Sequence, residues 1–186
     1  MAERADVVRN RSAVLDAATA LFARDDLGHV TLARIAEAAG VGKATVLRHY
    51  GSLEGVIEAV LARQVAAVQE RVRTGEPPLG PGGSADERVH AFLDTLIDFV
   101  LGNRALIRAI EHRRPDAYYA NPASQFWIAE LGRRIRAVDS ETDAGYRAYV
   151  VVTAVRADVV DYLRTAEKMS VRRIRAGLHA LVVSGH

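Results

Sequence analysis

The most informative stretch of this 186-residue sequence reads Thr31-Leu-Ala-Arg-Ile-Ala-Glu-Ala-Ala-Gly40-Val-Gly42-Lys-Ala-Thr-Val-Leu-Arg-His-Tyr50. Thr31 is a preferred N-cap residue, and Gly40 permits a first helix to end in a left-handed conformation. The turn Gly40-Val-Gly42 then leads directly into a second helical pattern. Two helices joined so tightly predict a helix-turn-helix, the motif that lays its second helix in the major groove of DNA.

One face of the second helix carries mostly polar and basic side chains, because Val46 and Tyr50 are expected to face inward. Arg48 can donate two hydrogen bonds to a guanine base or clamp a phosphate. Backbone N–H groups and the helix dipole attract phosphate to the first turn. The outward set is Lys43, Ala44, Thr45, Leu47, Arg48 and His49. The plainer alternative is a helical hairpin in a core, whose exposed residues happen to be polar.

Helical spacing continues on both sides of this motif. Apolar residues between 14 and 22 and between 56 and 68 lie on single helix faces, the second run following a break at Gly51-Ser52. Residues 74–84 hold three of the five prolines and predict a loop. That loop ends in Ser84 and Glu87, the spacing of a capping box.

The second half of the chain is also predicted to be helical. Asn103 can cap a short helix that Pro115 ends, and Asn121 followed by proline begins another. Ser140 is expected to cap a long helix reaching about residue 168, and Ser170 to cap the last one. No useful length of sequence alternates with period two, so the prediction is an all-α fold of about nine helices.

The N-terminal third resembles the N-terminal domain of the TetR family. The resemblance rests on Leu15-Asp-Ala-Ala, Leu21-Phe22, the stretch from Val30 to Tyr50 and Ser52-Leu-Glu-Gly-Val-Ile, and it covers about residues 9–62 without a gap. It implies a homodimeric transcriptional regulator, most often a repressor, that binds a near-palindromic operator in double-stranded DNA and is released by a small ligand. It also implies a DNA-binding domain over 1–52, a connecting helix over 53–73 and a ligand-binding and dimerisation domain over 74–186.

The same resemblance implies the DNA contacts. Positions matching Thr45 and His49 contact phosphates in that family, and those matching Lys43, Ala44 and Arg48 lie against the groove. The expected DNA-binding set is Thr31, Arg34, Lys43, Ala44, Thr45, Leu47, Arg48, His49 and Tyr50.

Two positions depart from the common family pattern. Leu47 replaces a tyrosine whose hydroxyl usually reaches a phosphate, and Leu53 replaces a lysine. They leave open a second interpretation, a helical dimeric interaction protein that has lost specific DNA reading. Arg4, Arg9 and Arg11 can act as a basic arm in the minor groove or form a solvated terminus.

Dimerisation and ligand binding are expected of the C-terminal helices. The predicted helix over 141–168 is apolar almost all round and is therefore expected to be buried on more than one side. With the last helix it can form a four-helix bundle between two copies, through Val152, Val159, Leu178 and Leu181. The candidate pocket residues for a small apolar or amphipathic effector, or alternatively plain core, are Phe92, Leu96, Ile107, Ile110, Tyr118, Phe126, Trp127 and Tyr149.

Composition narrows the functional classes. A net charge of +2 and a pI near 9.1 permit nucleic acid as a partner, and the absence of cysteine excludes disulfides and thiolate metal sites. The histidines at 29, 49, 90, 112, 179 and 186 include no pair with zinc-helix spacing, and no nucleophile motif occurs. We therefore expect no enzyme, no cofactor and no metal, with Asp158 and Asp161 as partners of Arg156 or Arg164. No secretory or membrane segment is recognised, so the expected location is the cytoplasm.

Overall fold

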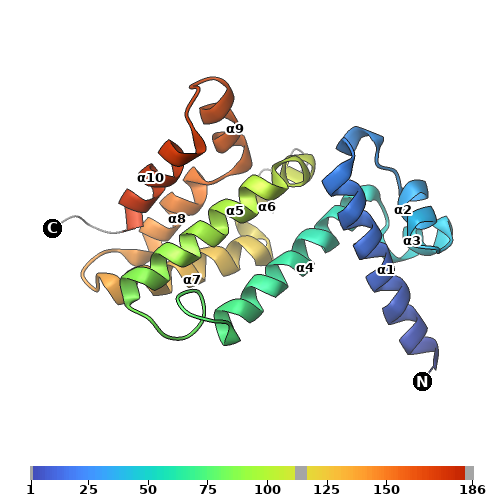
Figure 1. Cartoon of the computed structure of the whole chain (residues 1–186), viewed down its shortest axis with the longest axis horizontal. Coiled ribbons are helices and arrows are strands. Elements are labelled where there is room, and N and C mark those ends of the chain that lie inside the picture. Colours follow the sequence, from blue (N-terminus) through green and yellow to red (C-terminus); the bar gives the residue numbers. More distant parts are fainter. Residues whose placement is uncertain (1, 112–116, 183–186) are drawn as a thin grey trace. The chain divides into compact units, whose positions relative to one another are not determined.

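The computed structural model describes residues 2–111 and 117–182, and all regular structure in these residues is helical (Figure 1). The predicted all-α class is confirmed. The chain divides into two compact units, Met1–Val65 and Ala66–His186. The division falls inside the helix that the sequence assigns as the connection. Pro115, expected to end a helix, lies outside the described residues.

The first unit contains α1 (Ala2–Arg24), the short 3-10 helix η1 (Leu27–His29), α2 (Leu32–Ala38), α3 (Lys43–Tyr50) and the beginning of α4 (Leu53–Thr74). The apolar positions that predict these helices form its core, because each helix buries one stripe. The most deeply buried side chains are Val14, Ala18, Val30, Ile35, Val46, Val56, Ile57 and Val60.

Hydrogen bonds fix α4 and α3 against α1. The Arg63 guanidinium donates to a carboxylate oxygen of Asp16 at 2.6 Å, to the Thr19 hydroxyl at 3.0 Å and to the Leu15 carbonyl at 3.1 Å. The Tyr50 hydroxyl donates to the Arg11 carbonyl at 3.3 Å. Helix α3 of the helix-turn-helix and helix α4 are therefore both joined to α1 by side-chain hydrogen bonds.

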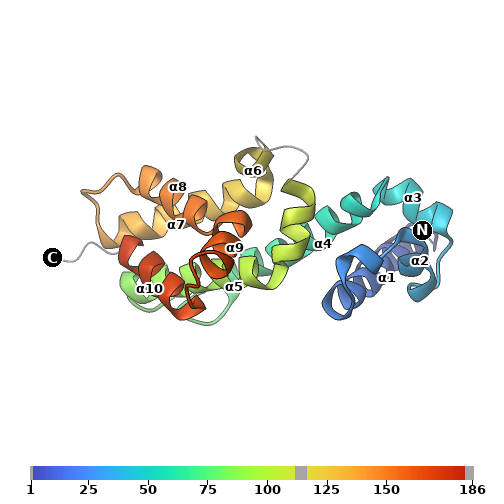
Figure 2. The same cartoon turned by 90° about the horizontal axis from the view of Figure 1, so that it is seen from above.

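The second unit contains the rest of α4, then α5 (Ala85–Glu111), α6 (Ala117–Ala120), α7 (Pro122–Val138), α8 (Ala144–Ala154), α9 (Ala157–Thr165) and α10 (Val171–Val182). Helix α7 packs on both α5 and α8, and α10 packs on α5 and α8 (Figure 2). Phe92, Leu93, Leu131 and Ile135 fill the centre with no exposed surface.

Most of the predicted helix starts are confirmed by the hydrogen bonds of their caps. The Thr31 hydroxyl accepts from the Arg34 N–H, Ser84 and Glu87 form the reciprocal capping box, and Asn121 and Ser170 cap α7 and α10.

Two predicted starts are wrong. Helix α5 runs through Asn103, whose side chain donates to the Phe99 carbonyl at 2.9 Å instead of capping a new helix. The N-cap of α8 is Asp143, which accepts from the Tyr146 N–H at 3.0 Å, and not Ser140.

The long helix predicted up to residue 168 is interrupted between α8 and α9. Tyr118 of α6 donates its hydroxyl to the Val152 carbonyl at 3.2 Å, so this carbonyl no longer needs the Arg156 N–H. The Arg156 N–H bonds the Thr153 carbonyl instead, and the Arg156 guanidinium lies 4.4 Å from the centre of the Tyr118 ring. The break therefore coincides with contacts from Tyr118 of a helix distant in the sequence.

A buried arginine joins three segments of the second unit. Arg134 of α7 is only 2% exposed and donates to the carbonyls of Leu79 and Arg88, each at 2.7 Å. It also pairs with Glu130 at 2.7 Å. Through these bonds it fastens the loop after α4 and the first turn of α5 to α7.

Among the helices of the described residues, none combines the length and the apolar character that crossing a bilayer requires.

Candidate nucleic-acid interface

Helix α3 presents one continuous outward face. Val46 is fully buried and Tyr50 half-buried, as the spacing predicts. The side chains on the other side are exposed, except that of Thr45, which is half-buried; they are Lys43, Ala44, Leu47, Arg48 and His49. This face carries two permanent positive charges and the hydrogen-bonding groups of Thr45 and His49, which suits a polyanion.

The turn before α3 shapes the approach to this face. Gly40 has φ +66°, a left-handed conformation that disfavours side chains with a Cβ. Gly42 is the N-cap of α3 and offers no side chain to cap its first turn. No side chain therefore caps the start of α3, where the positive end of the helix dipole lies, although the Thr45 N–H donates to the Gly42 carbonyl at 2.9 Å.

Two other expected DNA-binding residues, Thr31 and Arg34, also have structural contacts. Thr31 caps α2. Arg34 donates to the carboxylate of Asp25 at 2.6 Å and to the His29 carbonyl at 2.7 Å. Hydrogen bonds from Arg24 and Arg34 hold the pKa of Asp25 below its usual value, so this carboxylate stays charged. The Arg34 guanidinium is therefore already engaged by Asp25 and by the His29 carbonyl.

The two departures from the family pattern occupy different environments. Leu47 is 49% exposed on the outward face of α3, whereas Leu53 is half-buried at the first position of α4. Leu47 thus adds apolar surface within a polar face, which is favourable against a thymine methyl group or a sugar.

The N-terminal arginines lie on a helix and not on an extended arm. Helix α1 begins at Ala2, and Arg9 and Arg11 are exposed on it, Arg9 in an ion pair with Asp6. The side chain of Arg4 lies outside the described ones.

Three of the eight candidate pocket residues, Phe92, Phe126 and Trp127, form an aromatic cluster. Phe92, Phe126 and Trp127 contact one another with ring centres 5.2–5.9 Å apart, and Phe99 joins them beside Trp127. Leu96 is buried nearby on α5, and Ile107 and Ile110 are half-buried farther along it. Tyr149 is 49% exposed and contacts Tyr119, away from this cluster.

Tyr118 lies beside the break between α8 and α9. Burial and the charge of Glu111 raise the pKa of Tyr118, so its hydroxyl remains a donor at neutral pH. Arg156 is paired with Asp158, as the sequence predicts, and this hydrogen bond lowers the pKa of Asp158. Asp161 pairs with Arg104 of α5, at 2.9 Å, and not with Arg156 or Arg164.

The four residues expected at a dimer interface lie in different environments. Val152 and Leu178 are buried inside the second unit, and Val159 is half-buried. Only Leu181, 42% exposed, presents a large part of its side chain to the outside. The other large apolar side chains exposed on these helices are Tyr146, Tyr149, Val150 and Tyr162.

No group of three or more His, Asp or Glu residues in the described parts of the chain is arranged to hold a metal ion. The structure does bring together a pair that the sequence does not suggest. The Nδ1 atoms of His90 and His179 lie 2.5 Å apart, and His179 Nε2 donates to Asp94 at 2.8 Å. His112 and His186 lie outside the described residues.

The fold and the exposed face of α3 define the class: an all-α protein with an N-terminal helix-turn-helix whose outward face suits DNA. Residues 14–60 match the model of a family described as bacterial regulatory proteins, tetR family. No curated protein shows significant sequence similarity to the chain.

Solved structures share the fold over nearly the whole chain. A TetR transcriptional regulator from Rhodococcus sp. RHA1 is 17% identical, with a TM-score of 0.64 over 94% of this chain and 93% of that one. A protein assigned as a transcriptional regulator from Saccharomonospora viridis, in complex with choline, is 20% identical, with a TM-score of 0.69 over 92% and 94%. The fatty acid degradation regulator FadR from Bacillus halodurans is 14% identical, with a TM-score of 0.65 over 95% of each chain.

The resemblance of the N-terminal helices to the TetR family is therefore confirmed over residues 14–60, and the chain as a whole shares the fold of the solved structures.

Proposed function

We propose that the protein is a homodimeric repressor that binds a near-palindromic operator and leaves it when a small apolar or amphipathic ligand binds the second unit. The single observation that carries the proposal is the outward face of α3, with Lys43, Arg48 and His49 exposed beside an uncapped helix N-terminus. These groups match what major-groove binding needs.

The size of the recognition element supports the proposed dimer. Helix α3 has eight residues and reaches few base pairs, so useful specificity needs two copies about 34–36 Å apart on the DNA. The exposed tyrosines and Leu181 on α8–α10 give a surface on which two chains can associate.

The aromatic cluster of Phe92, Phe126 and Trp127 supports an apolar or amphipathic effector, because such clusters line ligand sites in helical domains. Among proteins with this fold, one is in complex with choline and another regulates fatty acid degradation. Both names are consistent with small ligands that have an apolar part.

Salt-dependent binding to DNA from upstream of its own gene tests the proposal directly. A repressor of this kind is expected to bind one site tightly, with an affinity that falls steeply as salt rises. The competing interpretation, a helical dimeric interaction protein that has lost specific DNA reading, predicts no such binding.

Arg48→Ala is expected to weaken operator binding by about 1–3 kcal/mol and to relax the preference at one base position, if its guanidinium bonds guanine twice. Fluorescence anisotropy on a set of operator variants measures both effects. Arg71→Ala, which removes one exposed arginine of α4, is the matched control and should bind as the unchanged protein does. An equal loss on every sequence would make Arg48 a phosphate contact.

Leu47→Tyr is expected to tighten specific and non-specific DNA binding together by about 0.5–1.5 kcal/mol, because the new hydroxyl can donate to a phosphate. Since Leu47 is 49% exposed, the larger side chain fits without disturbing the core. Titration of operator and random DNA at two salt concentrations measures the change. Unaltered affinity would show that position 47 faces away from the phosphate backbone.

A further inference from the structure

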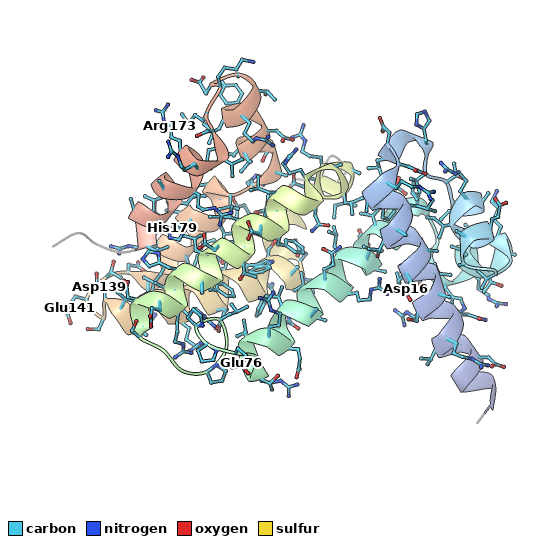
Figure 3. The ribbon with its side chains drawn as sticks, in the orientation of Figure 1. Asp16, Glu76, Asp139, Glu141, Arg173 and His179 are labelled. Carbon is cyan, nitrogen blue, oxygen red and sulfur yellow. The ribbon has the colours of Figure 1, made fainter. Side chains whose placement is uncertain are left out.

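Two histidines from different helices of the second unit meet at a half-exposed site. His90 of α5 and His179 of α10 lie with their Nδ1 atoms 2.5 Å apart and their ring centres 4.7 Å apart. Figure 3 shows His179 on α10, the helix that packs on α5. The two side chains are 32% and 23% exposed, so an ion from solution can reach them and keep water among its ligands.

A carboxylate faces the far nitrogen of each ring. His179 Nε2 donates to Asp94 at 2.8 Å. His90 Nε2 lies 3.7 Å from Asp86, one helical turn earlier on α5. Partial burial raises the pKa of Asp94, but hydrogen bonds from His179 and Arg175 outweigh burial and hold this pKa below its usual value. Since a charged carboxylate only accepts, the His179 proton resides on Nε2, and the lone pair of its Nδ1 is directed at His90.

The row of side chains around the pair is negatively charged. On α5 it consists of Asp86, His90, Asp94 and Asp98, at four-residue spacing. From α10, Arg175 bonds Asp94 and Asp98, each at 2.5 Å. Three carboxylates against one guanidinium leave two negative charges when the histidines are neutral. The exposed charges next to the row, Glu87 on α5 and Arg172 on α10, have opposite signs and leave this balance unchanged. The row therefore attracts a divalent cation.

We propose that the Nδ1 atoms of His90 and His179 bind one divalent ion of a late first-row transition metal, such as Zn²⁺, which joins α5 to α10. Neutral imidazole nitrogen is a preferred ligand of these metals. With the ion on Nδ1, both rings carry their proton on Nε2, directed at Asp86 and Asp94. A carboxylate behind each ligating histidine fixes its tautomer and orientation. The inference is independent of the proposed DNA binding.

The ion fits after a small movement of the rings. Two nitrogen atoms bound to a tetrahedral Zn²⁺ at 2.0–2.1 Å lie about 3.3 Å from each other. From their 2.5 Å contact the rings therefore have to separate by less than about 1 Å, which small rotations of two half-exposed side chains provide. Because the carboxylates occupy the far nitrogens, the protein supplies two ligands and water the others. This agrees with the lack of any group of three such ligands in the described residues.

Zinc titration of the full-length protein, without an affinity tag, tests the proposal. Isothermal titration calorimetry at neutral pH should show one Zn²⁺ per chain and no binding of Mg²⁺, which prefers oxygen ligands. His90→Ala and His179→Ala should each weaken zinc binding by about tenfold or more, because each removes one of two protein ligands. His29→Ala is the matched control: it removes an exposed histidine of the first unit and should bind zinc as the unchanged chain does.

Nitrogen-15 NMR of the histidine rings gives a second readout on the unchanged protein, so it does not depend on the folding of a variant. Zinc should shift the Nδ1 signals of His90 and His179 and leave the proton of both rings on Nε2. Asp94→Asn should weaken zinc binding by about tenfold, since it removes the charge behind His179. Ligation through Nε2, undiminished binding in both alanine variants, or no binding at millimolar zinc would each overturn the site.

Discussion

Arg134→Met is expected to lower the free energy of unfolding of the second unit by about 3–5 kcal/mol, the range for breaking a buried charged network from one side. Methionine keeps most of the apolar stem but leaves the carbonyls of Leu79 and Arg88 without the donors that satisfy them. Urea unfolding followed by tryptophan fluorescence measures the loss. The chain has a single tryptophan, the buried Trp127, so the signal reports this unit alone.

Arg133→Met is the matched control for that experiment. Arg133 belongs to the same helix and bonds the same carboxylate, Glu130, but its side chain is 54% exposed. We expect a loss of about 0.2–1 kcal/mol, typical of a surface pair. Equal losses in the two variants would show that burial of Arg134 contributes nothing beyond an ordinary ion pair.

The helix-turn-helix could be predicted because its determinants are local. The Thr31 cap, the left-handed Gly40 and the inward Val46 lie within sixteen residues of one another, and each affects only its own turn. The same is true of the capping box at Ser84 and of the start of α7. These features can be predicted correctly because residues close in the sequence determine them.

The sequence-based predictions are wrong where residues distant in the sequence determine the local structure. Nothing near Val155 in the sequence signals a break, since the Tyr118 hydroxyl that takes the Val152 carbonyl comes from another helix. Asn103 is a good cap by type, yet the continuous packing of α5 keeps it helical. Arg134 attracts no notice in the sequence, because an arginine in a helix is usually on the surface.

The candidate DNA-binding surface and the candidate dimer surface differ in the same respect. The helical period alone predicts which residues of α3 face outward. Which apolar residues of α8 and α10 face out depends on how many helices already cover them. Both Val152 and Leu181 satisfy the apolar pattern, but only Leu181 remains on the surface. The helical period shows that these helices carry more apolar residues than one buried face needs. Only the packing of the surrounding helices shows which of these residues remain exposed.

Leu181→Arg is accordingly expected to give folded monomers that do not bind the operator. The change places a charge at the proposed interface twice per dimer, and even about 3 kcal/mol of desolvation in total corresponds to about a hundredfold weaker association. Operator affinity falls with it, because a single α3 reaches only half of a palindromic site. Multi-angle light scattering measures the mass, circular dichroism the helix content, and anisotropy the binding.

Two variants of matched chemistry show whether position or charge is responsible. Ala129→Arg adds the same side chain at an exposed site on α7 and should remain dimeric and bind DNA. Val152→Arg, by contrast, inserts the charge at a side chain that is 2% exposed, so it should unfold the second unit instead of releasing intact monomers. If Leu181→Arg stays dimeric, the interface lies on another face, and the exposed tyrosines of α8 need a different partner.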